Sequence, residues 1–192
     1  MNNFMHNLNL QKFQFIDDLN IKSISKDITN LSIIYRNYSK KIKSNELIKL
    51  KQFCKKKRIK FYISNKIEEC LKYNLDGLYI PSFNKRNLTK KLNLNKQTII
   101  GSAHNHIEIR KKIEQGCKII FLSPLFKTYK FKYLDIPRFN LTKMSFKNKF
   151  VALGGIRKKN MHKVKMLNIH GISGISMYKK KPASFKAGFN KF

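Results

Sequence analysis

The chain is 192 residues long, enough to bury a hydrophobic core in one domain, and 42% of its residues are hydrophobic, which excludes intrinsic disorder. No apolar run reaches the roughly 20 residues that cross a bilayer, and the polar stretch 1–12 lacks the apolar core of a signal peptide, so we expect a cytoplasmic protein. The three cysteines, Cys54, Cys70 and Cys117, are scattered, which favours reduced core residues over disulfides or a metal site.

The formal net charge of +32 is the most unusual property of the composition. Such an excess of cations attracts polyanions, phosphorylated ligands or anionic surfaces. The lysines occur in nearly every segment and not in one stripe, so a general bias toward lysine on solvated surfaces also explains the charge. Aromatic residues interleaved with lysine over 126–150 leave open a nucleic-acid-binding protein. Nucleic acid is the less favoured partner, because the chain carries no RNA-binding signature.

Eight short apolar runs bounded by turn residues predict eight β-strands. A continuous apolar run is typical of a parallel strand covered on both faces, because neither of its sides faces water. The predicted strands are 13–16, 31–35, 61–63, 78–80, 98–101, 118–122, 150–153 and 172–177.

Apolar residues at helical spacing predict helices between several of these strands. One helix is expected to start at Ser44 as its N-cap and to end at Arg58. Asn65 is predicted to cap the next helix, and Asn105 to cap a later helix that stops at Gly116. Further expectations are a weakly helical stretch over 84–91, a long basic loop before strand 150–153, and a short helix over 161–167.

The alternation of strands and helical segments predicts an α/β fold, a compact (β/α)8 TIM barrel with parallel strands. Because the chain lies just under the ~200 residues typical of the smallest such barrels, we expect short or missing helices. Residues 1–178 are predicted to form a single barrel domain and 179–192 a basic C-terminal tail. An open doubly wound sheet is the alternative, but no Gly-x-Gly-x-x-Gly follows any predicted strand.

In a parallel barrel the carboxyl ends of the strands share one face, where the chemistry is located. Hydroxyls, amides and cations dominate the residues expected there, and this set suits phosphate binding better than acid–base chemistry. Gly154 and Gly155, just before Arg157, can bring backbone N–H groups close to an oxyanion. The residues expected at this face are Asp17, Asp18, Arg36, Ser64, Asn65, Ser82, Asn84, Ser102, Thr128 with nearby lysines, Gly154, Gly155, Tyr178 and Lys179.

Seven short motifs along the chain, taken together, have a recognisable order and spacing. They are 33–36, 61–65, 76–80, 102–105, 123–128, 152–156 with Asn160 after it, and 171–175. Over residues 13–178 this series resembles the thiamine phosphate synthase and thiazole tautomerase family, whose fold is a (β/α)8 barrel.

The resemblance implies a transferase of thiamine biosynthesis. Synthases of this family join a hydroxymethylpyrimidine diphosphate to a thiazole phosphate and release pyrophosphate, assisted by Mg²⁺ and cationic side chains. The resemblance therefore implies phosphorylated small molecules as partners, and it implies catalytic roles for Arg36 and Lys130. The family's two magnesium-binding aspartates fall on Asn65 and Asn84, which are thus the predicted metal ligands. The implied substrate-binding residues are Arg36, Ser64, Asn65, Ser102, Thr128, Lys130, Gly154 and Gly155.

Several positions depart from the family's pattern. Ile34, Asn37 and Tyr38 stand where the family has glutamine, glutamate and lysine beside the arginine. Pro124 occupies the position at which the tautomerases carry a histidine, which argues against tautomerase activity. These departures leave open a catalytically degenerate barrel that binds phosphorylated ligands as a regulatory or binding protein.

Overall fold

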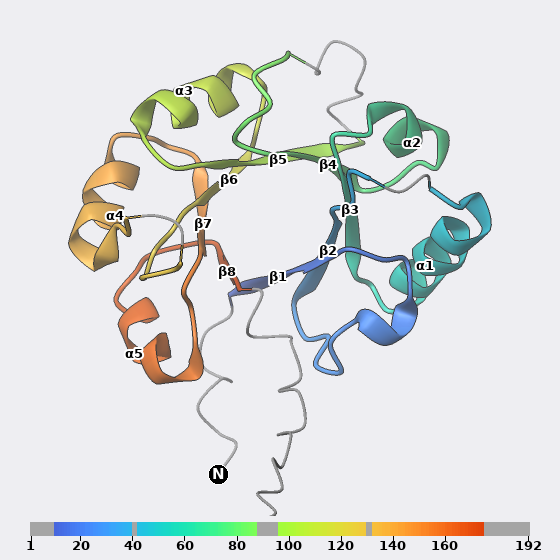
Figure 1. The fold of residues 1–192 in the computed structure, drawn as a ribbon, viewed down its shortest axis with the longest axis horizontal. Coiled ribbons are helices and arrows are strands. Elements are labelled where there is room, and N and C mark those ends of the chain that lie inside the picture. The colour runs from blue at the N-terminus through green and yellow to red at the C-terminus, as the bar shows by residue number, and fades with distance from the viewer. Residues whose placement is uncertain (1–9, 40–41, 88–95, 130–131, 175–192) are drawn as a thin grey trace, which may run out of the picture.

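The computed structural model describes residues 10–39, 42–87, 96–129 and 132–174 (Figure 1). Several predictions fall outside these described residues: the basic tail 179–192, the candidate catalytic Lys130, the end of the eighth predicted strand and part of the weakly helical stretch.

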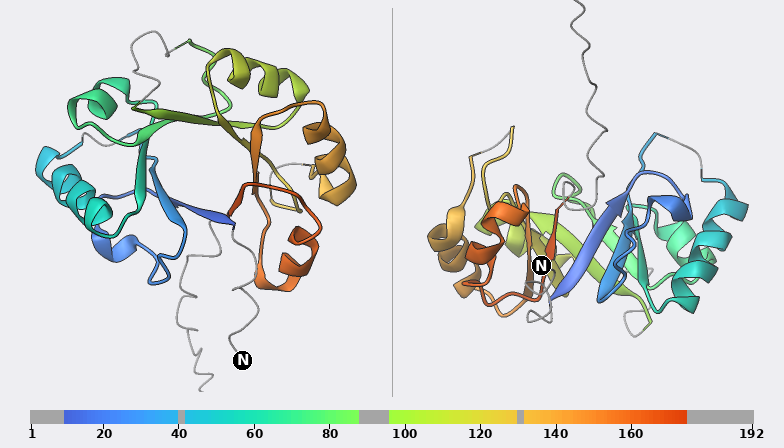
Figure 2. Two further views of the ribbon diagram at one scale, coloured as in Figure 1. Left: turned by 180° about the vertical axis from the view of Figure 1, so that it is seen from behind. Right: turned by 90° about the horizontal axis from the view of Figure 1, so that it is seen from below.

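Eight parallel strands form a closed barrel in sequence order, with β1 paired to both β2 and β8, so the predicted TIM barrel is confirmed. Figure 2 shows the strands enclosed by an outer ring of helices. The strands are β1 Gln11–Ile16, β2 Leu31–Tyr35, β3 Lys60–Ser64, β4 Gly77–Ile80, β5 Thr98–Ala103, β6 Ile119–Leu122, β7 Lys149–Leu153 and β8 Gly171–Ser173.

Some of the helices are short, as the length of the chain predicted: α2 has 6 residues and α5 has 4. None of the helices within the described ranges is long and apolar enough to cross a membrane. They are α1 Ser44–Lys56, α2 Ile67–Lys72, α3 His106–Glu114, α4 Asp135–Met144 and α5 Met161–Val164, with 3-10 turns η1 Ile21–Ser23 and η3 Lys158–Asn160.

Helix α4 lies in the segment expected to be a long basic loop, so that prediction was wrong. Only Phe139 and Thr142 of this helix are buried, and two residues three apart give too weak a periodicity to be noticed. The predicted eighth strand also begins one residue earlier than expected and ends at Ser173 in the described part of the chain.

Two of the three predicted helix caps were wrong. The N-cap positions of α1 and α2 are Lys43 and Lys66, and neither side chain makes a capping hydrogen bond. Asn65 instead has a positive φ of 59°, a conformation that asparagine tolerates better than most residues. The Asn105 cap is confirmed, because its Oδ1 accepts a hydrogen bond from the Glu108 backbone N–H at 2.9 Å.

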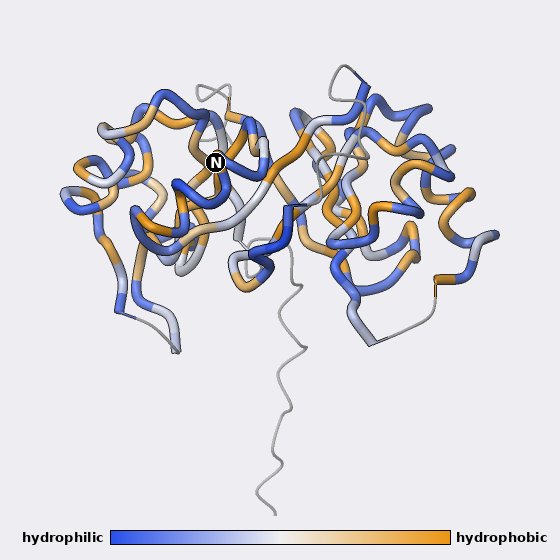
Figure 3. The backbone as a smooth tube through the Cα atoms, turned by 90° about the horizontal axis from the view of Figure 1, so that it is seen from above, coloured by the Kyte–Doolittle hydropathy of each residue, from blue (hydrophilic) through white to orange (hydrophobic). Residues whose placement is uncertain are grey.

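Aromatic side chains fill the interior of the barrel. Phe13 and Phe121 meet edge to face with ring centroids 4.9 Å apart, and Tyr62 and Tyr79 pack in the same cluster. A second, larger apolar cluster lies between the strands and the helices. Figure 3 shows the apolar stretches running through the interior and polar residues on the outer turns. Because these side chains fill the interior, the barrel has no channel through it, and ligands must bind at one of its ends.

The three cysteines are free and buried, as predicted. Burial raises the pKa of each thiol to about 12, so the reactive thiolate is scarce at neutral pH. We therefore expect no reaction of the folded protein with an aromatic disulfide reagent, and reaction of Cys54, Cys70 and Cys117 after denaturation. Absorbance of the released thiolate measures this, and rapid labelling of the folded protein would contradict the assignment.

Candidate functional site

The carboxyl ends of β2, β3 and β5 carry three of the predicted site residues. Side chains alternate between the two faces of a strand, and Ile34, Tyr62 and Ile100 lie in the cluster inside the barrel. The residues two positions further on, Arg36, Ser64 and Ser102, therefore belong to the same inner side, at the mouth of the barrel. The two serines are buried and Arg36 is half-buried.

Arg36 is held in place at this mouth by its neighbours. Its backbone N–H donates to the Ile16 carbonyl at 2.8 Å, and its guanidinium carbon lies 4.8 Å from the centre of the Phe15 ring. A cation over an aromatic face is attracted by the negative charge of the ring face. Arg36 thus has a fixed position at the rim rather than a freely solvated one.

An aromatic pair lies beside Arg36 on the same rim. The Tyr38 hydroxyl is 3.1 Å from the Ser64 Oγ, and the Tyr38 ring meets the Phe83 ring edge to face at 5.7 Å. Both rings remain largely exposed, Tyr38 by 52% and Phe83 by 67%. Two exposed rings that are anchored to the barrel mouth can pack against a planar ring of a ligand.

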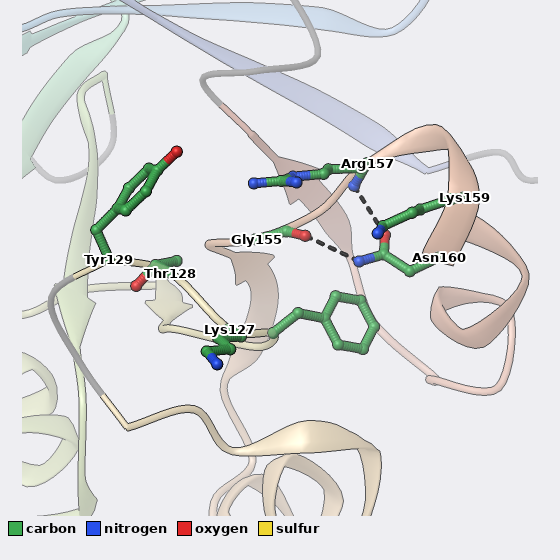
Figure 4. Close-up of a pocket in the computed structure, with 8 residues that line it drawn as sticks. Lys127, Thr128, Tyr129, Gly155, Arg157, Lys159 and Asn160 are labelled. Carbon is green, nitrogen blue, oxygen red and sulfur yellow. Dashed lines mark hydrogen bonds between the residues drawn. The ribbon is translucent and has the colours of Figure 1, made fainter.

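A pocket of about 340 Å³ opens between the loops that follow β6 and β7 (Figure 4). Among the described residues that line it, none carries a carboxylate, and three carry cations. Figure 4 shows Arg157 extending over the pocket toward Tyr129, with Lys127 on the side of the β6 loop. The lining residues are Phe126, Lys127, Thr128, Tyr129, Gly155, Arg157, Lys159 and Asn160.

The two loops are joined by a close backbone contact at Gly155. A Cβ added at Gly155 would lie 2.5 Å from the Phe126 carbonyl oxygen, and the glycine has a φ of 69°. Only glycine allows both the approach and this left-handed backbone without strain. The Phe126 N–H donates to the Gly154 carbonyl at 3.1 Å, so the β6 loop continues alongside the end of β7.

Asn160 fixes the other side of the pocket. Its Nδ2 donates to the Gly155 carbonyl at 2.9 Å, and its Oδ1 accepts from the Arg157 backbone N–H at 2.7 Å. These two bonds, drawn in Figure 4, hold the turn from Gly155 to Asn160 in one shape. Glycine backbone, a threonine hydroxyl and cations around one cavity are groups that can bind phosphate.

The predicted site residues separate into two groups. Thr128 and Gly155 line the pocket between β6 and β7, and Gly154 lies next to it, against Pro124. Arg36, Ser64 and Ser102 are at the strand ends of β2, β3 and β5 and do not line that pocket. Lys130 lies outside the described residues, and its role stays a prediction.

Sequence reasoning missed several residues that the structure places at these two sites. Lys127, Arg157 and Lys159 gave no signal because lysine and arginine occur throughout the chain. Tyr38 and Phe83 were also missed. Their positions directly after the ends of β2 and β4 were one indication, and Tyr38 also stands where the family has a lysine.

Asn65 and Asn84 do not have the arrangement of magnesium ligands. The Asn84 Nδ2 donates to the Asn65 Oδ1 at 2.8 Å, and the Asn84 Oδ1 accepts from the Arg86 backbone N–H at 2.9 Å. Each amide oxygen already accepts a hydrogen bond and carries no net charge, so the pair lacks the negative charge that normally attracts a hard dication. Nor do the described residues include any group of three His, Cys, Asp or Glu side chains that could hold a metal. The residues present do not fit Mg²⁺ here.

The fold and the pocket define a class: a (β/α)8 protein whose β6 and β7 loops enclose a pocket lined by cations. The family follows from the sequence: a family model described as thiamine monophosphate synthase matches residues 24–178. The chain belongs to this family.

Individual relatives are consistent with that membership. A thiamine-phosphate synthase of Pelagibacter ubique is 32% identical over 176 residues, which cover 85% of this chain and 81% of the relative. One of Prochlorococcus marinus is 30% identical over 136 residues, 68% of this chain, but the chain spans only 39% of that relative's length. A thiamine phosphate pyrophosphorylase structure from Pyrococcus furiosus has the same fold, with a TM-score of 0.71 at 16% identity over 90% of this chain and 89% of that one.

Replacing Gly155 by alanine tests the close contact between the two loops. The added Cβ must displace the Phe126 carbonyl, so we expect Gly155→Ala to weaken binding of inorganic phosphate by about tenfold or more while the barrel stays folded. Isothermal titration calorimetry measures the affinity, and circular dichroism checks the fold. An unchanged affinity would show that the phosphate site lies elsewhere.

The role of the pocket's cations in phosphate binding can be tested by comparing a lining cation with a neighbouring cation that does not line the pocket. Arg157→Ala removes a lining guanidinium, whereas Lys158→Ala removes an exposed charge next to it that does not line the pocket. Because a charge-assisted hydrogen bond contributes about 1.5–3 kcal/mol, we expect roughly a ten- to hundredfold weaker phosphate affinity for Arg157→Ala only. Equal losses in both variants would mean that phosphate senses only the overall charge.

Proposed function

We propose that this chain is a thiamine phosphate synthase. It would join a hydroxymethylpyrimidine diphosphate to a thiazole phosphate and release pyrophosphate. The observation that carries the proposal is the cation-lined pocket around Gly155, at the carboxyl end of the barrel in a member of this family.

The two separated groups of residues suit two phosphorylated substrates. The monophosphate of the thiazole would bind in the pocket, where Thr128, Gly155 and Arg157 offer donors to its oxygens. The diphosphate would lie at the barrel mouth near Arg36 and Ser102. The exposed rings of Tyr38 and Phe83 would then pack against the pyrimidine.

The reaction needs stabilisation of negative charge more than proton transfer. The bond between the pyrimidine methylene carbon and the diphosphate oxygen breaks, and the oxygen keeps the electron pair. The lone pair of the thiazole nitrogen forms the new carbon–nitrogen bond, so no proton has to be removed. Arg36, fixed over Phe15, would stabilise the charge that develops on the departing pyrophosphate, and Lys130 is proposed to assist. Because the reaction needs cations to stabilise negative charge and no base to remove a proton, it can proceed at a site that is poor in carboxylates.

A second candidate function is binding of phosphorylated ligands without turnover. The hydrogen bond between Asn65 and Asn84 favours it, because the two amides stand where the family resemblance places magnesium-binding aspartates. A barrel that lost catalysis could retain the phosphate pocket and serve as a binding or regulatory protein.

Direct assay of the two substrates distinguishes these functions. We expect purified protein, mixed with both substrates and Mg²⁺, to form thiamine phosphate, detected by chromatography. Arg36→Ala should lower kcat by about a hundredfold, because it removes a group that stabilises developing charge, whereas the exposed Arg110→Ala should not.

Each outcome of the assay decides between the candidates. Heat of binding without product would support the binding protein. Neither product nor heat of binding for either substrate would exclude both functions.

A further inference from the structure

A lysine is buried beneath the loop that follows β4. Lys112 belongs to α3, on the outside of the barrel, and its side chain is 1% exposed. Its Nζ donates hydrogen bonds to the Pro81 carbonyl, the Asn84 carbonyl and the Gln115 Oε1, each at 2.8 Å. An ammonium group has three donors, so all three are used.

Gln115, one turn further along, completes this support. It is also 1% exposed, and its Nε2 donates to the Asn84 carbonyl at 3.0 Å and to the Arg86 carbonyl at 2.7 Å. The Asn84 N–H closes the turn by donating to the Pro81 carbonyl at 3.1 Å. The loop from Pro81 to Arg86 is therefore held by two side chains, one from α3 and one from the C-cap of that helix.

The same loop carries the side chain that meets Asn65. The Asn84 amide is oriented by the Arg86 N–H and donates to Asn65, as described above. The ammonium group of Lys112 thus donates a hydrogen bond to the backbone carbonyl of Asn84. The side chain of this same Asn84 is one of the two that would have to bind a cation. In a poorly solvated environment, a buried ammonium repels a second cation nearby more strongly than it would in water.

The ammonium form of Lys112 is compatible with neutral pH. Burial lowers the pKa of Lys112 to about 8, chiefly through loss of solvation, and the group stays mostly protonated below that value. Three oxygen acceptors around the Nζ favour the charged form as well.

We propose that Lys112 organises the β3–β4 rim in place of a divalent cation. Asn65 and Asn84 form a hydrogen-bonded clasp rather than a pair of metal ligands, and the clasp keeps its shape without metal. The remaining amide hydrogens of the clasp are donors, which suit an anionic oxygen of a ligand and repel a cation. Lys112 is a positioning residue, because it is buried and acts through the loop. The inference is independent of whether the chain turns over the proposed substrates.

Hydrogen exchange of the loop tests this inference in the full-length chain. The reporters are the Asn84 and Arg86 amides, which are hydrogen-bonded within the loop. With Lys112→Met, we expect these amides to exchange about tenfold faster or more, while the barrel strands keep their protection. In the native chain, exchange should be the same in millimolar Mg²⁺ and in chelator.

A neighbouring lysine provides the matched control. Lys111 lies on the outer side of the same helix, where its Nζ contacts Glu114 at 2.9 Å, and Lys111→Met should leave the loop amides unchanged. Should Lys112→Met fail to fold, Gln115→Leu removes two of the supporting donors and should also speed exchange in the loop. Protection of the loop by Mg²⁺ in the native chain would overturn the proposal, as would unaltered exchange in a folded Lys112→Met protein.

Discussion

The close approach of two loops at the carboxyl end of the barrel is the constraint on which the candidate site depends. The chain after β6 passes so near Gly155 that no side chain fits between the glycine and the Phe126 carbonyl. This contact brings the hydroxyl of Thr128, a backbone turn and the cations of both loops around one cavity. The turn is then fixed by Asn160, which bonds to both of its ends. In the proposed function, phosphate would meet a preorganised set of donors, so little would have to rearrange when the anion enters.

The opposite part of the rim is organised in a different way. There the interior of the barrel ends in Arg36 and two buried serines, and the adjacent β4 loop rests on Lys112 and Gln115. Buried polar groups are costly unless all of their hydrogen bonds are made, and the Lys112 donors all are. The clasp and its support explain why a chain with asparagine at both proposed metal positions can keep an ordered rim.

The sequence predicted the barrel because each strand is a short apolar run, and eight such runs in alternation with helices allow few other folds. It did not predict α4, since only Phe139 and Thr142 of that helix are buried. Gly155 was predicted from two signals: a glycine pair directly after a strand, which lets the backbone approach an oxyanion, and the resemblance to the family. Arg157 and Lys159 were missed because 42 lysines and arginines provide no contrast from which to select two. Lys112 could not have been found, because its burial depends on where the β4 loop lies relative to α3.

The most direct test of the phosphate site is a crystal structure of the protein with the thiazole phosphate bound. Density for the phosphate should lie between the β6 and β7 loops, within hydrogen-bonding distance of Thr128, the Gly155 backbone N–H and Arg157. Density for the phosphate at any other place on the barrel, with this pocket filled only by solvent, would contradict the assignment.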